Sequence, residues 1–341
     1  MKFSLCCAPA SGANFISQLV ILQHLCQIHY KPDLCLGSSG GNLALYIAAA
    51  ADWQWADIER ISKELKSSFF AMKWSFLNPI SHLLGFFNGT AFTDGKGLSD
   101  FLKTYFTDES IVKYQIITGT YNKDLQKIRL FVNTSKESSL IKDDYFDYDL
   151  TQSMHPCYMD GDYDLIATAG LASASIPGLV PPKLIDGHYY SDGASSINSP
   201  MTILHSAMLK ALTRDDELHI TYVNCKDLSH AKILPNHNLF DTWKQAVNDL
   251  IKSQTLIDRL AAFQLLQNQG GSSDTKKMSF PCNHENLLMI KQLENKYKYT
   301  LLEIYPTQSA DIDITNFTSE DIERNMKMLY ESCHCHFWWI D

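Results

Sequence analysis

The hydrophobic positions of the first 50 residues fall into short continuous runs and longer segments with helical spacing. Residues 2–7 are rich in strand-forming side chains, and residues 33–36 contain a short apolar run after Asp33, so both segments predict strands. Between them, apolar residues recur every three or four positions over residues 15–29, which predicts a helix. Residues 42–51 are apolar on every face, so a fully buried helix is expected there. This order of strand, helix, strand and helix is typical of a parallel sheet covered by helices.

The same reasoning extends along the rest of the chain. Helices are predicted over residues 95–106, 201–212, 239–267, 286–297 and 318–332, and strands over 114–121, 128–133, 219–225 and 299–305. Thr318 and Asp321 have the spacing of a capping box at the start of the last helix. No internal repeat or domain linker interrupts the pattern. We therefore expect one α/β domain over residues 1–341, in which residues 201–341 complete the part formed by residues 1–200.

An aromatic segment over residues 69–87 departs from this pattern. Its density of phenylalanine and tryptophan is unusual, and it is broken at Asn78-Pro79. One interpretation is that these side chains pack over the core, as most aromatic clusters do. The other is a cap or rim that touches lipid, because aromatic residues suit membrane interfaces.

A polar and acidic segment covers residues 135–164. Asp160, Asp162 and Asp164 have the spacing that begins a calcium loop. Leu165 and Leu171 stand where such a loop needs its turn glycine and its bidentate glutamate, so a calcium site is rejected. We expect a solvated loop instead.

Composition limits the partners and the compartment. The net charge of −9 gives no reason to expect a basic nucleic-acid-binding surface, so no nucleic-acid partner is expected. The nine cysteines are scattered, and several lie in apolar runs where free cysteine packs as a small hydrophobe, which favours a reducing compartment. The first apolar run is too short for a signal peptide, and no window is long enough for a transmembrane helix. A cytoplasmic protein, or one peripheral at membranes, is expected.

A glycine-rich turn follows the second predicted strand. Gly37, Ser39 and Gly41 spell G-x-S-x-G. A serine at such a strand-to-helix corner is held in a strained conformation, and only residues without a bulky side chain fit beside it. Its hydroxyl would lie near the helix N-terminus, where developing negative charge is favoured. Taken alone, this pattern is also typical of an ordinary glycine-rich connection.

A second block lies far downstream, and it carries a family resemblance. It reads Ala172-Ser-Ala-Ser-Ile-Pro-Gly178-Leu-Val-Pro-Pro182, and it continues to Asp192-Gly193-Ala194 and Asn198-Ser-Pro200. In this order after G-x-S-x-G, the blocks resemble the patatin-like phospholipases over residues 2–200. The resemblance implies a three-layer α/β fold with a mostly parallel central sheet and helices on both faces.

The resemblance also implies a function and a site. It implies a lipid acyl hydrolase of the phospholipase A type, with Ser39 as nucleophile, Asp192 as general base, and no cofactor or metal. The implied substrate is a phospholipid or another acyl lipid, which allows peripheral membrane contact. Gly37, Gly41 and Gly193 are the glycines that support the two motifs.

The chemistry of this residue pair agrees with the resemblance. A serine hydroxyl is a weak nucleophile until a positioned base removes its proton, and a carboxylate in a desolvated site can have its pKa raised enough to act as that base. Gly193 allows a tight turn that presents the carboxylate of Asp192. Asp186, which precedes Gly187, is a competing Asp-Gly pair, and we expect it to lie in a hairpin turn.

An α/β-hydrolase with a Ser-Asp-His triad is an alternative. His219, His230 and His237 follow Asp192 in the chain order that such a triad requires. Only one strand and one helix precede the strand that leads to Ser39, whereas the elbow of an α/β-hydrolase usually follows several strands. The position of the serine therefore favours the dyad.

The loop after the first strand departs from the family pattern. Patatin-like enzymes carry a glycine-rich loop there, whose N–H groups form the oxyanion hole. This chain has Ala8-Pro9-Ala10-Ser11-Gly12, so three glycines are absent, a serine replaces the basic residue, and Pro9 has no N–H to donate. The candidate oxyanion donors are the N–H groups of Ala8, Ala10, Gly12 and Gly40.

The altered loop keeps a non-enzymatic alternative open. The loss of one oxyanion donor typically costs about 10²–10³ in turnover. Either the candidate donors rebuild the hole, or the protein is a catalytically weak or inactive relative that binds lipid or membranes.

The C-terminal segment carries two further candidates. Cys333-His-Cys-His336, with Cys282 and His284, offers zinc-binding side chains, but alternating residues of an extended segment point to opposite sides and no standard zinc spacing is met. No metal is expected. Residues 337–340 are expected to be a packing tail or a second lipid-facing patch.

Overall fold

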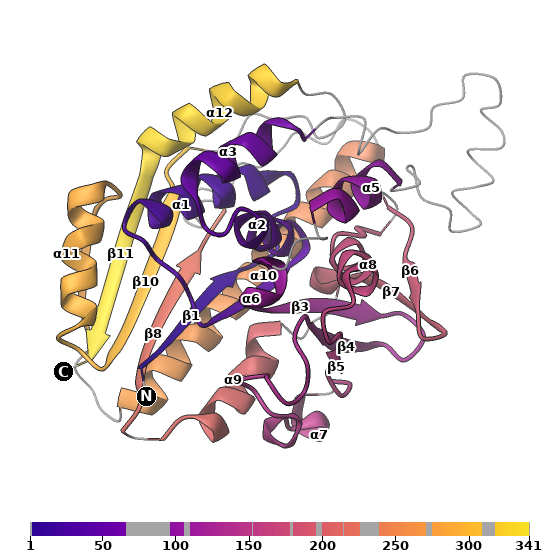
Figure 1. Cartoon of the computed structure of the whole chain (residues 1–341), viewed down its shortest axis with the longest axis horizontal. Helices are drawn as coiled ribbons and strands as arrows, with labels where there is room; N and C mark the ends of the chain where they lie inside the picture. The colour runs from indigo at the N-terminus through magenta and orange to yellow at the C-terminus, as the bar shows by residue number, and fades with distance from the viewer. Residues whose placement is uncertain are drawn as a thin grey trace.

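The computed structural model describes residues 2–65, 96–105, 110–151, 153–177, 180–195, 200–213, 215–225, 239–270, 275–308 and 318–340. Its strands are β1 (Lys2–Ala8), β2 (Leu34–Ser38), β3 (Gln115–Asn122), β4 (Lys127–Val132), β5 (Cys157–Tyr158), β6 (Lys183–Ile185), β7 (His188–Asp192), β8 (Glu217–Val223), β9 (Thr275–Pro281), β10 (Tyr299–Pro306) and β11 (Cys333–Ile340). All of these strands belong to one sheet, which runs through the middle of the molecule (Figure 1).

Helices surround this sheet (Figure 1). They are α1 (Phe15–Gln27), α2 (Ser39–Ala50), α3 (Trp55–Lys63), α5 (Lys96–Tyr105), α6 (Ser110–Lys113), α7 (Tyr148–Thr151), α8 (Tyr163–Ser173), α9 (Pro200–Ala211), α10 (Leu239–Gly270), α11 (His284–Glu294) and α12 (Ser319–Ser332). Short 3-10 helices are η1 (Gly12–Asn14), η3 (Asp143–Tyr145) and η4 (Gly193–Ser195).

The centre of the sheet is parallel. The strand order is β5-β4-β3-β2-β1-β8-β10-β11-β9, and β3, β2, β1, β8 and β10 pair in parallel with their neighbours in this series. Ala8 at the end of β1 pairs with Gly37 near the end of β2. Because parallel strands end at the same edge of a sheet, the loops after β1 and β2 meet there. This edge carries the G-x-S-x-G turn.

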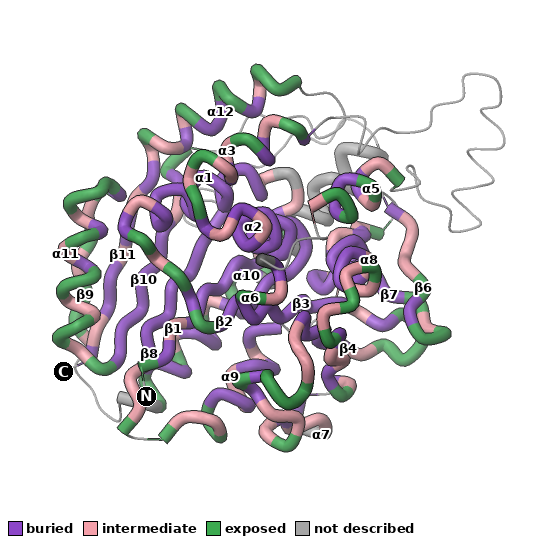
Figure 2. The backbone as a smooth tube through the Cα atoms, viewed as in Figure 1, coloured by how far each residue is buried: buried purple, intermediate pink, exposed green. Residues whose placement is uncertain are grey.

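The two faces of the sheet bury separate cores. Alternate residues of β1 point to opposite faces: Cys6 and Ala8 pack with α1, α2, α3, α8, α11 and α12, whereas Leu5 and Cys7 pack with α9 and α10. Figure 2 shows the central strands and α2 as buried, while α11 and α12 expose their outer sides. This is the three-layer α/β fold that the resemblance implied, with a mostly parallel sheet and helices on both faces.

Most predicted elements are present with small shifts in their ends. The helix expected at residues 42–51 begins three residues earlier, at Ser39, and it is buried as expected. Thr318 and Asp321 form the expected capping box at the start of α12. The aromatic segment 69–87 lies outside the described residues. The search for membrane-spanning helices, made over the described residues, found none long and apolar enough.

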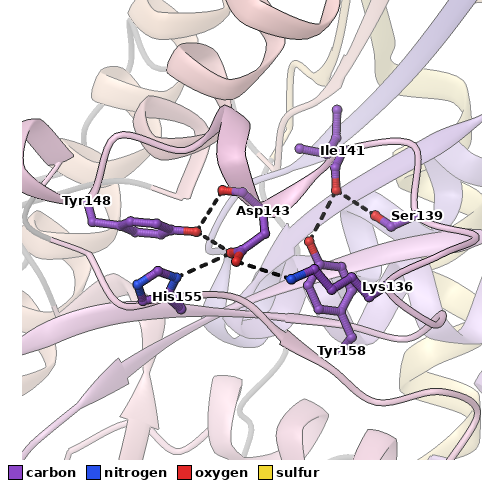
Figure 3. A network of polar contacts seen from close by, with 7 residues as sticks. All are labelled: Lys136, Ser139, Ile141, Asp143, Tyr148, His155 and Tyr158. Carbon is purple, nitrogen blue, oxygen red and sulfur yellow. Dashed lines mark hydrogen bonds and ion pairs between the residues drawn. The ribbon is translucent and has the colours of Figure 1, made fainter.

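The acidic segment 135–164 contains short helices, strand β5 and the start of α8 as well as loop. The Asp162 carboxylate caps α8 by accepting the N–H of Leu165 at 3.0 Å, because the first N–H groups of a helix lack intrahelical acceptors. The connection between β4 and β5 is held by a polar network centred on Asp143 (Figure 3). The expectation of a loop was therefore wrong from Tyr163, where α8 begins.

In that network, the Asp143 carboxylate accepts the hydroxyl hydrogen of Tyr148 and lies 3.4 Å from both Lys136 Nζ and His155 Nδ1 (Figure 3). Partial burial acts to raise the pKa of Asp143, but the hydrogen bonds from Tyr148, His155 and Lys136 outweigh it and lower that pKa. The charged form of Asp143 is thus favoured, and it ties the connection to α7.

The C-terminal tail is a packing element. Residues 333–340 form β11, which lies between β10 and β9, and Phe337 and Ile340 are buried. The packing interpretation is confirmed, and the lipid-facing interpretation was wrong. Strand β9 was not predicted, because its residues are exposed or half-buried and show no strong apolar run.

Candidate active site

Ser39 lies at a sharp corner between β2 and α2. Its φ of +54° is in the left-handed region, which a non-glycine residue occupies at a cost of about 1–3 kcal/mol. The corner is crowded, because a Cβ added at Gly37 would lie 2.6 Å from Asn42 Cα, and one added at Gly41 would lie 2.2 Å from the Ala8 carbonyl oxygen. The two motif glycines are therefore required by the close approach of the backbone.

Asp192 meets Ser39 although 153 residues separate them. The Ser39 hydroxyl donates a hydrogen bond to Asp192 Oδ2 at 2.5 Å. The other carboxylate oxygen of Asp192 accepts the N–H of Ala194 at 2.8 Å. The strands explain the meeting, since β7 pairs with β3 at Thr120 and Asp192, and β3 pairs with β2 at its end. Both side chains are buried.

The environment of Asp192 tunes its proton affinity. Burial raises the pKa of this carboxyl from 3.8 to about 7, while the hydrogen bonds from Ser39 and from the Ala194 N–H act in the opposite direction. A carboxylate with a pKa near neutrality can accept a proton from a neighbouring hydroxyl and return it. The pair thus has the geometry and the proton affinity of a base beside a nucleophile.

Gly193 allows the turn that follows Asp192. A Cβ at this position would lie 2.5 Å from the carbonyl oxygen of Gly119 and 2.7 Å from Ser38 Oγ. Only a glycine leaves room for this contact with β2 and β3. The Asp-Gly pair is therefore explained by space as well as by the tight turn expected from the sequence.

The loop after β1 packs directly on this site. A Cβ added at Gly40 would lie 2.5 Å from Ser11 Oγ and 2.6 Å from the Gly12 carbonyl oxygen, so the loop touches the serine corner. Ala10 is buried against Ala194, two residues after Asp192. The altered loop thus lies next to the residues that follow Ser39 and Asp192.

Side chains hold the peptide groups of this loop in defined directions. The Pro9 carbonyl accepts a hydrogen bond from Gln18 Nε2 at 2.9 Å, and the Ala10 carbonyl accepts one from the Thr255 hydroxyl at 3.4 Å. No cis peptide bond is present in the described residues. Because C=O and N–H point in opposite directions in a trans peptide, the N–H groups of Ala10 and Ser11 point away from Gln18 and Thr255.

The N-terminus of α2 adds further donors. The first four N–H groups of an α-helix have no intrahelical acceptor, and α2 begins at Ser39. The Ser39 N–H is already used, since it donates to Ser173 Oγ at 2.9 Å. The Gly40 N–H is the next in order. An anion is favoured at such a helix end.

The competing residues lie elsewhere. Asp186 and Gly187 form the exposed β6–β7 turn with positive φ angles, so the expected hairpin is confirmed. His219 pairs with Ser4 at the opposite end of β1 from Ala8, its Nδ1 lies 2.8 Å from the Thr300 hydroxyl, and burial lowers its pKa to about 4. His230 and His237 lie outside the described residues. No described histidine is hydrogen-bonded to Ser39 or Asp192.

Two polar residues of the site were missed by sequence reasoning. Ser173 contacts the Ser39 backbone, and the carbonyl of Ser175 accepts the Asp192 N–H at 3.1 Å. Both belong to the downstream block quoted for the family resemblance, but no role was assigned to them. Among the described residues, no three His, Cys, Asp or Glu side chains lie together as a metal site would require.

Comparison with known proteins places this chain in a family. The family model described as patatin-like phospholipase matches residues 11–205, which is more than half of the chain. The chain therefore belongs to the patatin-like phospholipase family, and this membership supports lipid acyl hydrolase activity in general. Among solved structures, the chain is similar to VipD from Legionella pneumophila, with 11% identity over 97% of this chain and 67% of that chain and a TM-score of 0.35. No curated protein matches it.

Proposed function

We propose that this protein hydrolyses fatty acyl esters of phospholipids or related lipids through an acyl-enzyme on Ser39. The observation that carries the proposal is the 2.5 Å hydrogen bond from the Ser39 hydroxyl to the buried carboxylate of Asp192. A hydroxyl in this position has a base within proton-transfer distance, and the raised pKa of Asp192 suits that base to neutral pH.

The proposed reaction has two stages. Asp192 takes the hydroxyl proton while Ser39 Oγ attacks the ester carbonyl carbon. The tetrahedral intermediate then collapses, the bond to the alcohol oxygen breaks, and the protonated Asp192 gives its proton to the leaving alcohol. In the second stage Asp192 takes a proton from water, whose oxygen attacks the acyl-enzyme. The fatty acid leaves and Ser39 regains its proton.

The oxyanion of these intermediates needs donors. We assign the N–H groups of Gly40 and Ala10 as the principal donors, because Gly40 follows Ser39 in the first turn of α2 and the Ala10 N–H points away from Gln18. The N–H groups of Ala8 and Gly12 are further candidates in the same loop. Pro9 supplies none.

A second function is favoured by one feature, the loop Ala8-Pro9-Ala10-Ser11 in place of glycines. A hole with fewer donors would leave a lipid-binding relative with weak or no turnover and peripheral membrane contact. Pro9→Gly separates the two cases. If the loop limits a working enzyme, this substitution raises turnover several-fold, and unchanged turnover contradicts that account.

The organisation of the chain fits one working unit. We propose that residues 1–341 form a single patatin-like domain, because β8, β10, β11 and β9 from the part after residue 200 continue the sheet of β1 to β5. Thr255 of α10, which also lies after residue 200, donates a hydrogen bond to the Ala10 carbonyl in the loop that follows β1.

The decisive experiment is covalent labelling by a fluorophosphonate probe, together with release of fatty acid from phosphatidylcholine vesicles. Labelling and release should both be lost in Ser39→Ala and in Asp192→Asn. Asp186→Asn is the matched control, because it changes the other Asp-Gly pair at an exposed turn and should retain both. His219→Gln should also remain active. A folded protein that the probe does not label would exclude the acyl-enzyme.

A further inference from the structure

The C-terminal end of α8 contacts both members of the Ser39–Asp192 pair. Ser173 is the last residue of α8 and is fully buried. Its hydroxyl oxygen accepts the Ser39 N–H at 2.9 Å and donates to the Gly119 carbonyl of β3 at 2.7 Å. One hydroxyl thus joins the serine corner, helix α8 and the central sheet.

The same short segment holds the other member. The carbonyl of Ser175, two residues further on, accepts the Asp192 N–H at 3.1 Å. The Ser175 hydroxyl donates to the Leu171 carbonyl at 2.7 Å, which fixes the segment to the end of α8. Nucleophile and base are therefore both attached to residues 173–175, although they come from distant parts of the chain.

We infer that Ser173 is a positioning residue, which sets the place of Ser39 relative to Asp192 and leaves the oxyanion to the donors of the neighbouring loop and Gly40. This inference rests on the proposed function. It follows from what a hydroxyl can do, since it accepts and donates one hydrogen bond at the same time. An alanine would leave the Ser39 N–H and the Gly119 carbonyl without this partner in a buried place.

The backbone of Ser39 explains why such support is needed. Its left-handed conformation is strained, and strained conformations persist only where the surroundings determine them fully. The Ser39 N–H is also the first N–H of α2, which no carbonyl of the helix can accept. The Ser173 hydroxyl fills that role, and by doing so it keeps the Ser39 N–H out of the oxyanion hole.

The test replaces Ser173 by Ala in the full-length protein. Since a displacement of about 1 Å can cost about 100-fold in rate, fluorophosphonate labelling and kcat for a soluble short-chain ester should fall about 10- to 100-fold. KM should stay within about twofold, because Ser173 does not face substrate in the proposed mechanism. Hydrogen exchange measured by mass spectrometry should be faster in the peptide that contains the Ser39 amide.

Ser62→Ala is the matched control. Ser62 is also fully buried, and its hydroxyl donates to the Ile58 carbonyl at 2.6 Å within α3, away from the site. Ser62→Ala loses one buried hydroxyl and its hydrogen bond, and it should keep the wild-type labelling rate, kcat and Ser39 exchange. Cysteine is close to serine in size, but its thiol is a weak donor and a weak acceptor. Ser173→Cys should therefore show the same decreases in labelling and kcat as Ser173→Ala, to a smaller degree. It is the variant to use if Ser173→Ala does not fold.

The outcomes separate the two proposals. Wild-type kcat, labelling and Ser39 exchange in the Ser173 variants would overturn the positioning role, and so would a loss that appears only in KM. If the wild-type protein is not labelled at all, the proposed function fails. In that case the exchange of the Ser39 amide still decides whether Ser173 holds the serine corner.

Discussion

Replacement of Asp192 by Asn should stabilise the protein at neutral and alkaline pH while it abolishes turnover. The carboxyl has a pKa of about 7 in the folded protein, against 3.8 as its ordinary value, because burial disfavours the charged form. The folded state therefore binds this proton more tightly than the unfolded state does. Between these two pKa values, the contribution of Asp192 to the unfolding free energy must therefore fall as pH rises. Asn keeps the size of the side chain and does not ionise.

The magnitude follows from the shift. A rise of about three pKa units, at about 1.36 kcal/mol each, corresponds to a loss of about 4 kcal/mol in unfolding free energy when Asp192 ionises. This loss is complete above pH 7 and absent below about pH 4. The advantage of Asp192→Asn over the wild type in unfolding free energy should therefore grow by about 3 kcal/mol between pH 5 and pH 8. This change with pH is independent of any constant difference in packing or hydrogen bonding between Asp and Asn.

The assay is urea denaturation of both proteins at pH 5, 6, 7 and 8, with unfolding monitored by intrinsic fluorescence. Asp186→Asn is the matched control, because it makes the same change of side chain at an exposed position in the β6–β7 turn. A difference for Asp192→Asn that is equal at pH 5 and pH 8, or that shrinks with rising pH, would refute the assignment of Asp192 as a desolvated carboxyl.

Three further predictions concern activity and local stability. Asp192 must be ionised to act as base, and its pKa is about 7, so kcat/KM should fall at acid pH. At pH 6 it should be about one tenth of its value at the alkaline plateau, and a flat profile from pH 5 to 8 would contradict this role. Gly193→Ala puts a methyl 2.5 Å from the Gly119 carbonyl oxygen and 2.7 Å from Ser38 Oγ, so it should cost about 1–3 kcal/mol in urea denaturation and reduce probe labelling at least tenfold; wild-type values in both assays would show that the turn has room for a side chain. Thr318→Ala removes the capping box of α12 and should lower the unfolding free energy by about 1 kcal/mol with no change in turnover, whereas Thr318→Ser should retain the stability.

In the proposed reaction, the buried carboxylate of Asp192 would link stability and function in one residue. A base that works near neutral pH needs a raised pKa, and desolvation is what raises it. The same desolvation penalises the charged form that catalysis requires. The protein would thus be least stable, with respect to this group, at the pH where the proposed reaction is fastest.

Local pattern was sufficient to predict most of the fold. Continuous apolar runs such as residues 33–36 predict strands buried on both faces, and these strands form the parallel centre of the sheet. Edge strand β9 was missed, because its residues are largely exposed and its partner β11 lies more than 50 positions further along the chain. Helix α8 was missed as well, since its capping Asp162 was assigned to an acidic loop.

For the candidate site, the sequence by itself determined the residue types. The spacing of Gly37, Ser39 and Gly41 is local and predicts a corner that only small neighbours permit, and the resemblance of Asp192-Gly193-Ala194 to the family motif favoured Asp192 over Asp186. These features follow from short-range sterics and from an ordered set of motifs. They indicate which side chains could react.

Only the tertiary structure decided how those side chains meet. The pairing of β7 with β3 and of β3 with β2 brings Asp192 to 2.5 Å from Ser39, and the surrounding core removes water and raises the pKa of the carboxyl. The hydrogen bonds of Ser173 also depend on the tertiary structure, since its partners Ser39 and Gly119 lie 134 and 54 residues away in the sequence. Distance, burial and proton affinity depend on contacts between remote segments, and no local pattern encodes them.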